Sequence, residues 1–123
     1  MLVDSHCHLD RLDLSNREGG IEAVISDAKA RGISHLLTVA VDLDSSKSLT
    51  EVTAKYDHIY SSVGVHPLQD EELPLPTVEE LVDLAKLPKV IAVGETGLDN
   101  FYGADSYDWQ YESFTRHLLA SKQ

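Results

Sequence analysis

The sequence predicts an α/β fold of four consecutive β-then-α units, the N-terminal half of a (β/α)8 barrel of the TIM type. Two observations support this prediction. Short β-type apolar runs alternate with segments whose apolar residues recur at helical spacing, which is typical of parallel strands joined by right-handed helical crossovers, as in a doubly wound sheet or a barrel. A complete eight-unit barrel has about 250 residues, whereas this chain has 123.

The first two units occupy residues 2–56. Residues 2–7 form the first predicted strand, and a helix that ends before Gly32 follows a polar loop. The inner face of this helix carries four apolar residues, Ile21, Val24, Ile25 and Ala28. The second strand is predicted over residues 35–41. The next helix carries Leu49, Val52 and Tyr56 on one side, with Asp44 or Ser45 as its expected N-cap.

The last two units follow the same alternation. A strand is predicted over residues 59–65, and Thr77 with Glu80 makes a capping box for the helix after it. The inner face of that helix consists of Val78, Leu81, Val82 and Ala85. Residues 90–93 form the fourth strand. A final helix is expected to start near Asp105 and presents four large apolar residues at helical spacing, Tyr107, Tyr111, Phe114 and Leu118.

We expect a single partial domain over residues 1–123, truncated after the fourth helix, because a fifth strand would come next. The net charge of −11 argues against a groove that holds nucleic acid through Lys and Arg. The single cysteine allows no internal disulfide, and neither a signal peptide nor a membrane-spanning stretch is recognisable. These features predict a cytoplasmic protein without a membrane partner.

His6 and His8 are the strongest candidates for chemistry. They lie two residues apart at the end of the first predicted strand, so both imidazoles point to one face. Imidazole is a good ligand for zinc and related divalent ions. The carboxyl ends of the strands are where (β/α) enzymes place their catalytic groups. The pair therefore favours a metal site over a pair of surface histidines.

Glu95 and His66 occupy corresponding positions after the fourth and third strands. Glu95 lies between Gly94 and Gly97, and a carboxylate directly after a buried strand calls for a cation beside it, which a metal would supply. His66 is a candidate to orient water, to contact a substrate phosphate or to carry a proton, although a histidine held by its turn fits equally well.

The other candidates favour structural interpretations. Cys7 is expected to pack as a small apolar residue rather than to act as ligand or nucleophile. Asp99 and Tyr102 follow Glu95 and could line a substrate mouth, but solvated loop residues are the better interpretation. The three remaining histidines, His35, His58 and His117, are interpreted as structural.

Three motifs together resemble the TatD family of metal-dependent deoxyribonucleases. They are DSHCHLD at residues 4–10, VGVHP at residues 63–67 and GETGLD at residues 94–99. The pattern of Gln110, Phe114 and His117 is also similar to the helix of that family after its fourth strand. The resemblance covers essentially all of the chain.

The resemblance implies an amidohydrolase-type barrel that hydrolyses DNA phosphodiester bonds with two divalent ions, which could be zinc, magnesium or manganese. It implies that His6 and His8 hold one ion and that Glu95 bridges to the second. It also places the remaining ligands, two histidines and an aspartate, on later strands that this sequence lacks. We therefore expect little or no activity from this chain alone.

Two alternatives remain open. A phosphoesterase of another His-x-His family would share the opening motif, although it would not explain residues 94–99. A non-catalytic half-barrel that self-associates through its open sheet edges is also compatible with the sequence, because exposed strand edges favour pairing with another chain.

Overall fold

The computed structural model describes residues 1–69, 72–102, 105 and 107–123. Its elements occur in the order β1 (Leu2–Cys7), the short 3₁₀ helix η1 (Leu9–Arg11), α1 (Gly20–Ala30), β2 (Ile33–Thr38), α2 (Leu43–Thr53), β3 (Ile59–Val63), α3 (Val78–Ala85), β4 (Val90–Val93) and α4 (Tyr107–Ala120). The strands pair in parallel in the order β1-β2-β3-β4. This architecture confirms the predicted fold class of four βα units.

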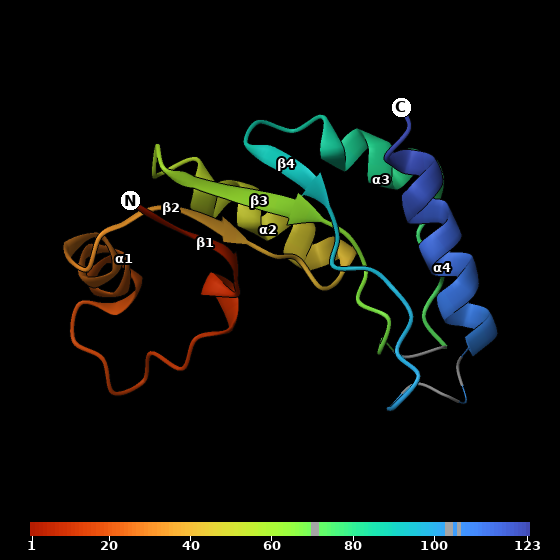
Figure 1. Ribbon diagram of the computed structural model, residues 1–123, viewed down its shortest axis with the longest axis horizontal. Coiled ribbons are helices and arrows are strands. Elements are labelled where there is room, and N and C mark those ends of the chain that lie inside the picture. The colour runs from red at the N-terminus through yellow and green to blue at the C-terminus, as the bar shows by residue number, and fades with distance from the viewer. Residues whose placement is uncertain (70–71, 103–104, 106) are drawn as a thin grey trace.

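Figure 1 shows the four strands side by side, with α1 near the β1 edge and with α3 and α4 near the β4 edge. Within the part of the chain that the structure describes, no further strand pairs with β1 or β4. The carboxyl ends of all four strands lie at the same end of the sheet, because the strands are parallel. Loops that follow the strands therefore meet there.

Two strands end earlier than the sequence predicted. β2 stops at Thr38 and β3 at Val63, although the residues beyond them are buried. The cause lies in hydrogen bonds to side chains. The backbone N–H groups of Ala40 and Gly64 donate to serine hydroxyls, those of Ser62 at 3.0 Å and of Ser46 at 3.3 Å. Buried serine hydroxyls thus take the place of backbone carbonyls as acceptors where the chain turns towards the next helix.

The predicted N-cap of α2 was wrong. Asp42 caps this helix: its Oδ1 accepts the N–H of Ser45 at 2.6 Å, and the Ser45 hydroxyl accepts the N–H of Asp42 at 3.0 Å. Ser45 is therefore the third residue of a capping box. The predicted box of Thr77 and Glu80 at the start of α3 is confirmed.

The buried apolar residues form two clusters between the sheet and its helices. One contains Leu9, Ile25, Leu36 and Ile59, and the other contains Val63, Leu81, Val82 and Ala120. The first cluster fixes η1 beside the sheet, and the second fixes α3 and α4 against β3. None of the helices in the described residues is long and apolar enough to cross a membrane.

The packed face of α4 differs from its apolar stripe. Tyr107, Tyr111 and Leu118 are 45%, 57% and 48% exposed. The buried residues of α4 are instead Gln110, Ser113, His117 and Ala120. The two large polar side chains can be buried because each has partners in the backbone. Gln110 bonds to the backbone of Asp99, and His117 bonds to the backbone of Val65 and of Ser113.

Candidate metal centre

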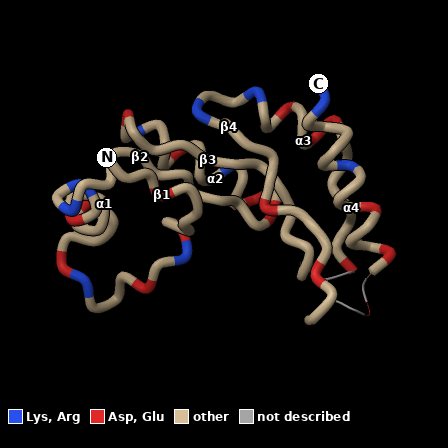
Figure 2. The backbone as a smooth tube through the Cα atoms, viewed as in Figure 1, with Lys and Arg blue, Asp and Glu red and all other residues tan. Residues whose placement is uncertain are grey.

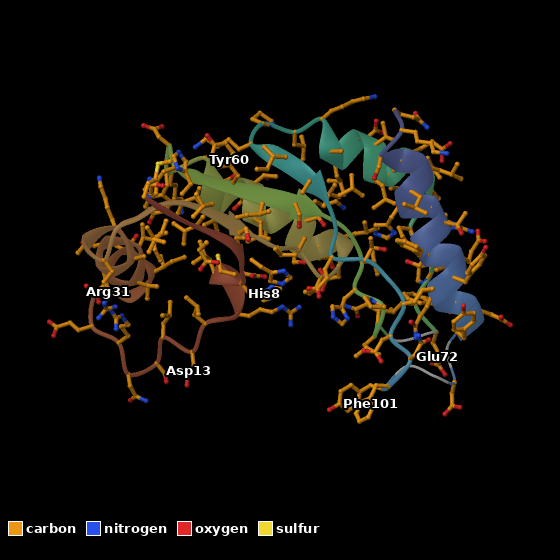
Figure 3. The ribbon with its side chains drawn as sticks, viewed as in Figure 1. His8, Asp13, Arg31, Tyr60, Glu72 and Phe101 are labelled. Atoms are coloured by element: carbon orange, nitrogen blue, oxygen red, sulfur yellow. The ribbon has the colours of Figure 1, made fainter. Side chains whose placement is uncertain are left out.

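His6 and His8 come together at the end of β1. His6 lies within the strand, and His8 is the N-cap of η1. Their ring centroids are 5.2 Å apart. Figure 3 shows His8 just beyond β1, whereas Phe101 lies on the segment that follows β4. The structure therefore brings both imidazoles to the carboxyl end of the sheet, as the sequence predicted.

Glu95 reaches the same point from the other edge of the sheet. Its backbone N–H donates to the Ala40 carbonyl at 2.9 Å, and the preceding Gly94 N–H donates to the Val63 carbonyl at 2.7 Å. These bonds hold the segment after β4 against β2 and β3. Glu95 Oε2 then lies 3.5 Å from Nε2 of His6 and 3.9 Å from Nε2 of His8.

The three side chains fit a divalent metal ion. One ligand atom from each of His6, His8 and Glu95 lies within 4.8 Å of the other two. Two ligands on one zinc ion at about 2.1 Å are themselves about 3.4 Å apart at tetrahedral angles. Movements of about 1 Å would therefore bring the three atoms onto one ion.

The hydrogen bonding of His8 also suits a ligand. Its Nδ1 lies 2.9 Å from the Val39 carbonyl, which can only accept, so Nδ1 carries the hydrogen. In the neutral imidazole this leaves the lone pair on Nε2, the nitrogen that faces Glu95. A backbone carbonyl commonly orients metal-binding histidines in this way.

His66 lies beside the three ligands but presents a different group. Its Nδ1 accepts the N–H of Leu68 at 3.0 Å, so the neutral ring carries its hydrogen on Nε2. That Nε2 lies 3.4 Å from Glu95 Oε1. His66 therefore offers an N–H donor towards the site rather than a lone pair.

A cavity of about 380 Å³ opens next to these side chains. It is lined by His8, Arg11, Val41, His66, Leu68, Gln69 and Glu95. Arg11 and Gln69 were not predicted from the sequence as site residues. Gln69 is held by a bond from its Nε2 to the Val41 carbonyl at 2.9 Å. Arg11 could have been found from its position three residues after His8.

A family profile described as TatD related DNase matches residues 3–123. The chain belongs to the TatD-related family. It is 38% identical over 122 residues to the Escherichia coli K12 protein "Uncharacterized metal-dependent hydrolase YcfH", a match that covers 99% of this chain and 45% of that protein. The predicted family resemblance is thereby confirmed.

Two further TatD-related proteins are similar. The "3'-5' ssDNA/RNA exonuclease TatD" of Citrobacter rodentium is 35% identical over 98 residues, covering 77% of this chain and 37% of that protein. The crystal structure of the TatD homologue YJJV from Escherichia coli K12 matches with a TM-score of 0.85 and 27% identity, covering 98% of this chain and 46% of that one. The chain thus spans about half the length of these relatives.

Within this TatD-related chain, Cys7 is not part of the cluster of His6, His8 and Glu95. Its thiol donates to the Leu37 carbonyl at 3.4 Å. Burial, together with the charges of Asp4 and Asp10, raises the pKa of Cys7 to about 12. The thiol therefore stays protonated at neutral pH, which agrees with a packing role.

Asp99 and Tyr102 do not line the cavity. Asp99 Oδ1 accepts the N–H groups of Phe101 and Tyr102 at 2.9 and 2.6 Å, so it shapes its own loop. Tyr102 is 79% exposed. Both positions agree with the preferred interpretation of Asp99 and Tyr102 as loop residues.

His35, His58 and His117 all lie outside the three-residue cluster. His35 is exposed and stacks on Tyr60 with ring centroids 6.2 Å apart. His117 is buried, accepts the N–H of Val65 at 3.0 Å and lies 2.7 Å from the Ser113 carbonyl. It ties α4 to the segment that carries His66.

Proposed function

We propose that this chain supplies part of the active site of a divalent-metal-dependent hydrolase that cleaves phosphodiester bonds in DNA. The observation that carries the proposal is the convergence of His6, His8 and Glu95 at the carboxyl end of the sheet. The printed names of the relatives, which include metal-dependent hydrolases and an exonuclease, support it.

Each residue has a distinct task in this proposal. His6, His8 and Glu95 would together hold one metal ion, and Glu95 would also help to hold a second. The bound ions would activate a water and neutralise charge that develops on the phosphate. The Val39 carbonyl keeps His8 in the tautomer that binds. His66, with its hydrogen on Nε2, donates to a phosphate oxygen or orients the attacking water.

Two features of the chain bear on the type of metal ion and on its role. Two imidazoles with one carboxylate suit zinc better than magnesium, which prefers oxygen ligands. The acidic balance of the chain also leaves phosphate neutralisation largely to metal ions, since the net charge is −11. The activity itself belongs to a complete barrel, and we expect this chain alone to be inactive or weakly active.

Metal binding is tested by calorimetric titration of the chain with Zn²⁺, Mn²⁺ and Mg²⁺. His6→Ala and Glu95→Gln should each weaken binding of the preferred ion by at least tenfold, because each removes one ligand. The matched control is His35→Ala, which removes an exposed histidine outside the cluster. Equal affinity in all four proteins would contradict the assignment.

Hydrolysis is tested in a protein that contains this sequence within a complete barrel. Metal-dependent release of nucleotides from labelled DNA should fall at least a hundredfold in Glu95→Gln. A smaller loss, without loss of metal binding, is expected for His66→Ala, because His66 donates a hydrogen bond and is not a ligand. Full activity of Glu95→Gln would refute the proposed role of this residue.

Open sheet edges favour a second candidate function, a half-barrel that pairs with a second copy of itself. Among the described residues nothing pairs with the outer edges of β1 and β4, and the edge residues Leu2, Val3 and Ile91 are 62%, 58% and 60% exposed. Two copies related by a twofold axis would join β4 of each to β1 of the other and give eight strands.

The mass of the chain in solution tests this candidate. Sedimentation at a protein concentration of about 100 µM, which exceeds a micromolar dissociation constant, should give a dimer. Ile91→Lys should give a monomer, because it places a charge on the β4 edge. Leu12→Lys, on a loop residue that is 42% exposed, serves as the control. A monomeric unmodified chain would contradict this function.

A further inference from the structure

Arg11 differs from the other basic residues in its position relative to the cavity. Half of the ten Lys and Arg residues lie near α1 or in the turn between α3 and β4 (Figure 2), and that turn leads into the amino end of β4. Among the described residues that line the 380 Å³ cavity, Arg11 is the only Arg or Lys. The chain has a net charge of −11, so a positively charged side chain beside the candidate metal ligands is a distinctive feature of this cavity.

The short helix η1 directs Arg11 towards the candidate ligands. Arg11 is the last residue of η1 and His8 is its N-cap, and the Arg11 N–H donates to the His8 carbonyl at 3.2 Å. The Arg11 side chain and the His8 imidazole both line the same cavity, together with Glu95.

Asp42 restrains the Arg11 side chain without occupying all of its donors. Nη2 of Arg11 lies 3.5 Å from Oδ2 of Asp42, and the Arg11 side chain is 53% exposed. Asp42 is itself fixed as the N-cap of α2. A guanidinium carries five N–H donors, so one carboxylate contact leaves donors for a second anion.

We propose that Arg11 binds the phosphate next to the scissile one, so that the preferred substrate is an oligonucleotide rather than a mononucleotide ester. This inference rests on the proposed function and extends it. Metal ions held by the candidate ligands would bind the scissile phosphate, and Arg11 would neutralise the neighbouring phosphate of the nucleic-acid strand. Arg11 is thus a specificity-determining residue that acts on substrate affinity, and hydrolysis does not require it.

The test compares single-stranded hexathymidylate binding to the chain and to two variants, by fluorescence anisotropy of a labelled probe with Mn²⁺. A gel establishes that the probe stays intact. Arg11→Gln should bind about tenfold more weakly, because one charge-assisted contact is lost. The slope of log K against log[salt] should become shallower by about 0.7. Thymidine monophosphate, which lacks a neighbouring phosphate, should bind equally to both proteins.

Arg17→Gln is the matched control. Arg17 pairs with Asp27 and is similarly exposed, but it does not line the cavity. This variant removes the same charge from the chain and should bind hexathymidylate as the unmodified chain does. An equal loss in both variants would show that only net charge matters, which overturns the inference.

A probe series with one methylphosphonate at each linkage gives the sharpest result. If Arg11 contacts one phosphate, neutralising that phosphate should abolish the difference between the unmodified chain and Arg11→Gln, and other positions should preserve it. A uniform difference at every position overturns the inference. If the unmodified chain binds hexathymidylate and Arg11→Gln matches it, only the role of Arg11 fails. If the unmodified chain binds no probe, the inference about Arg11 is overturned, whereas the proposed function is decided separately by the hydrolysis experiment in a complete barrel.

Discussion

Gly64→Ala should separate two strand ends and displace Glu95. A Cβ atom at Gly64 would lie 2.5 Å from the Gly94 carbonyl carbon, 2.7 Å from its oxygen and 2.8 Å from its Cα. All three atoms belong to the backbone, so no side-chain rotation can relieve the contact. Reaching an ordinary contact of 3.4 Å requires the two backbones to separate by about 0.9 Å.

This separation has a cost that follows from the surrounding bonds. The Gly94 N–H donates to the Val63 carbonyl at 2.7 Å, and a shift of that size would take this bond beyond hydrogen-bonding distance. Overpacking costs about 1–3 kcal/mol and a lost hydrogen bond about 1 kcal/mol. We therefore expect Gly64→Ala to lower the free energy of unfolding by about 3 kcal/mol.

The same shift should weaken metal binding, because Glu95 follows Gly94 directly. Displacing the groups that position one ligand typically weakens metal affinity by about 10–100-fold. Urea denaturation measures the stability, and calorimetric titration below the denaturation range measures the affinity. A variant with unchanged affinity and a stability within about 0.5 kcal/mol of the unmodified chain would refute the reasoning.

Gly32→Ala is the control for stability alone. Gly32 has φ of +89°, and a Cβ there would meet nothing within 4 Å. The substitution should cost about 1–2 kcal/mol through the left-handed backbone conformation. It should leave metal affinity unchanged, because Gly32 precedes β2 at the opposite end of the sheet from Glu95.

Three further predictions concern single side chains. Burial lowers the pKa of His117 from its ordinary value of 6.5. Below about pH 6.5 the unfolded chain therefore binds more protons than the folded chain, and the free energy of unfolding should decrease as the pH falls. In His117→Gln this decrease should be less steep. Iodoacetamide should alkylate Cys7 much more slowly in the folded chain than in urea, because the pKa of its thiol is raised to about 12. Thr77→Ala should lower the free energy of unfolding by about 1 kcal/mol in urea denaturation, because it removes the capping box with Glu80.

The elements were predictable where the apolar pattern decides the structure. All four strands and all four long helices follow from runs such as residues 90–93 and from helical faces such as Leu81 with Val82. The strand ends were not predictable, because serine hydroxyls take over the backbone donors there. Nothing in the sequence around Ser46 or Ser62 distinguishes a hydroxyl that accepts a backbone N–H group from one that faces solvent.

The packed face of α4 was hidden for a related reason. Its apolar residues suggest a stripe through Tyr111 and Leu118, but the helix instead buries Gln110 and His117. Gln110 bonds to backbone of the loop between β4 and α4, and His117 bonds to backbone of the loop after β3; such partners are known only when the fold is known. Local sequence reveals amphipathicity, whereas burial of polar groups depends on distant partners.

The position of the candidate site gives the strongest reason to regard the sheet as part of a barrel. The alternation of strands and helices is compatible with a doubly wound sheet as well. β1 and β4 are separated by two strands, so at about 4.8 Å per strand a flat sheet would place them about 14 Å apart. Yet Nε2 of His6 and Oε2 of Glu95 are 3.5 Å apart. Glu95 follows β4, and its N–H donates to the Ala40 carbonyl beyond β2, so the chain after β4 leans across the end of β3 towards β1. The carboxyl ends of the sheet thus converge, as they do in the geometry that closes a barrel.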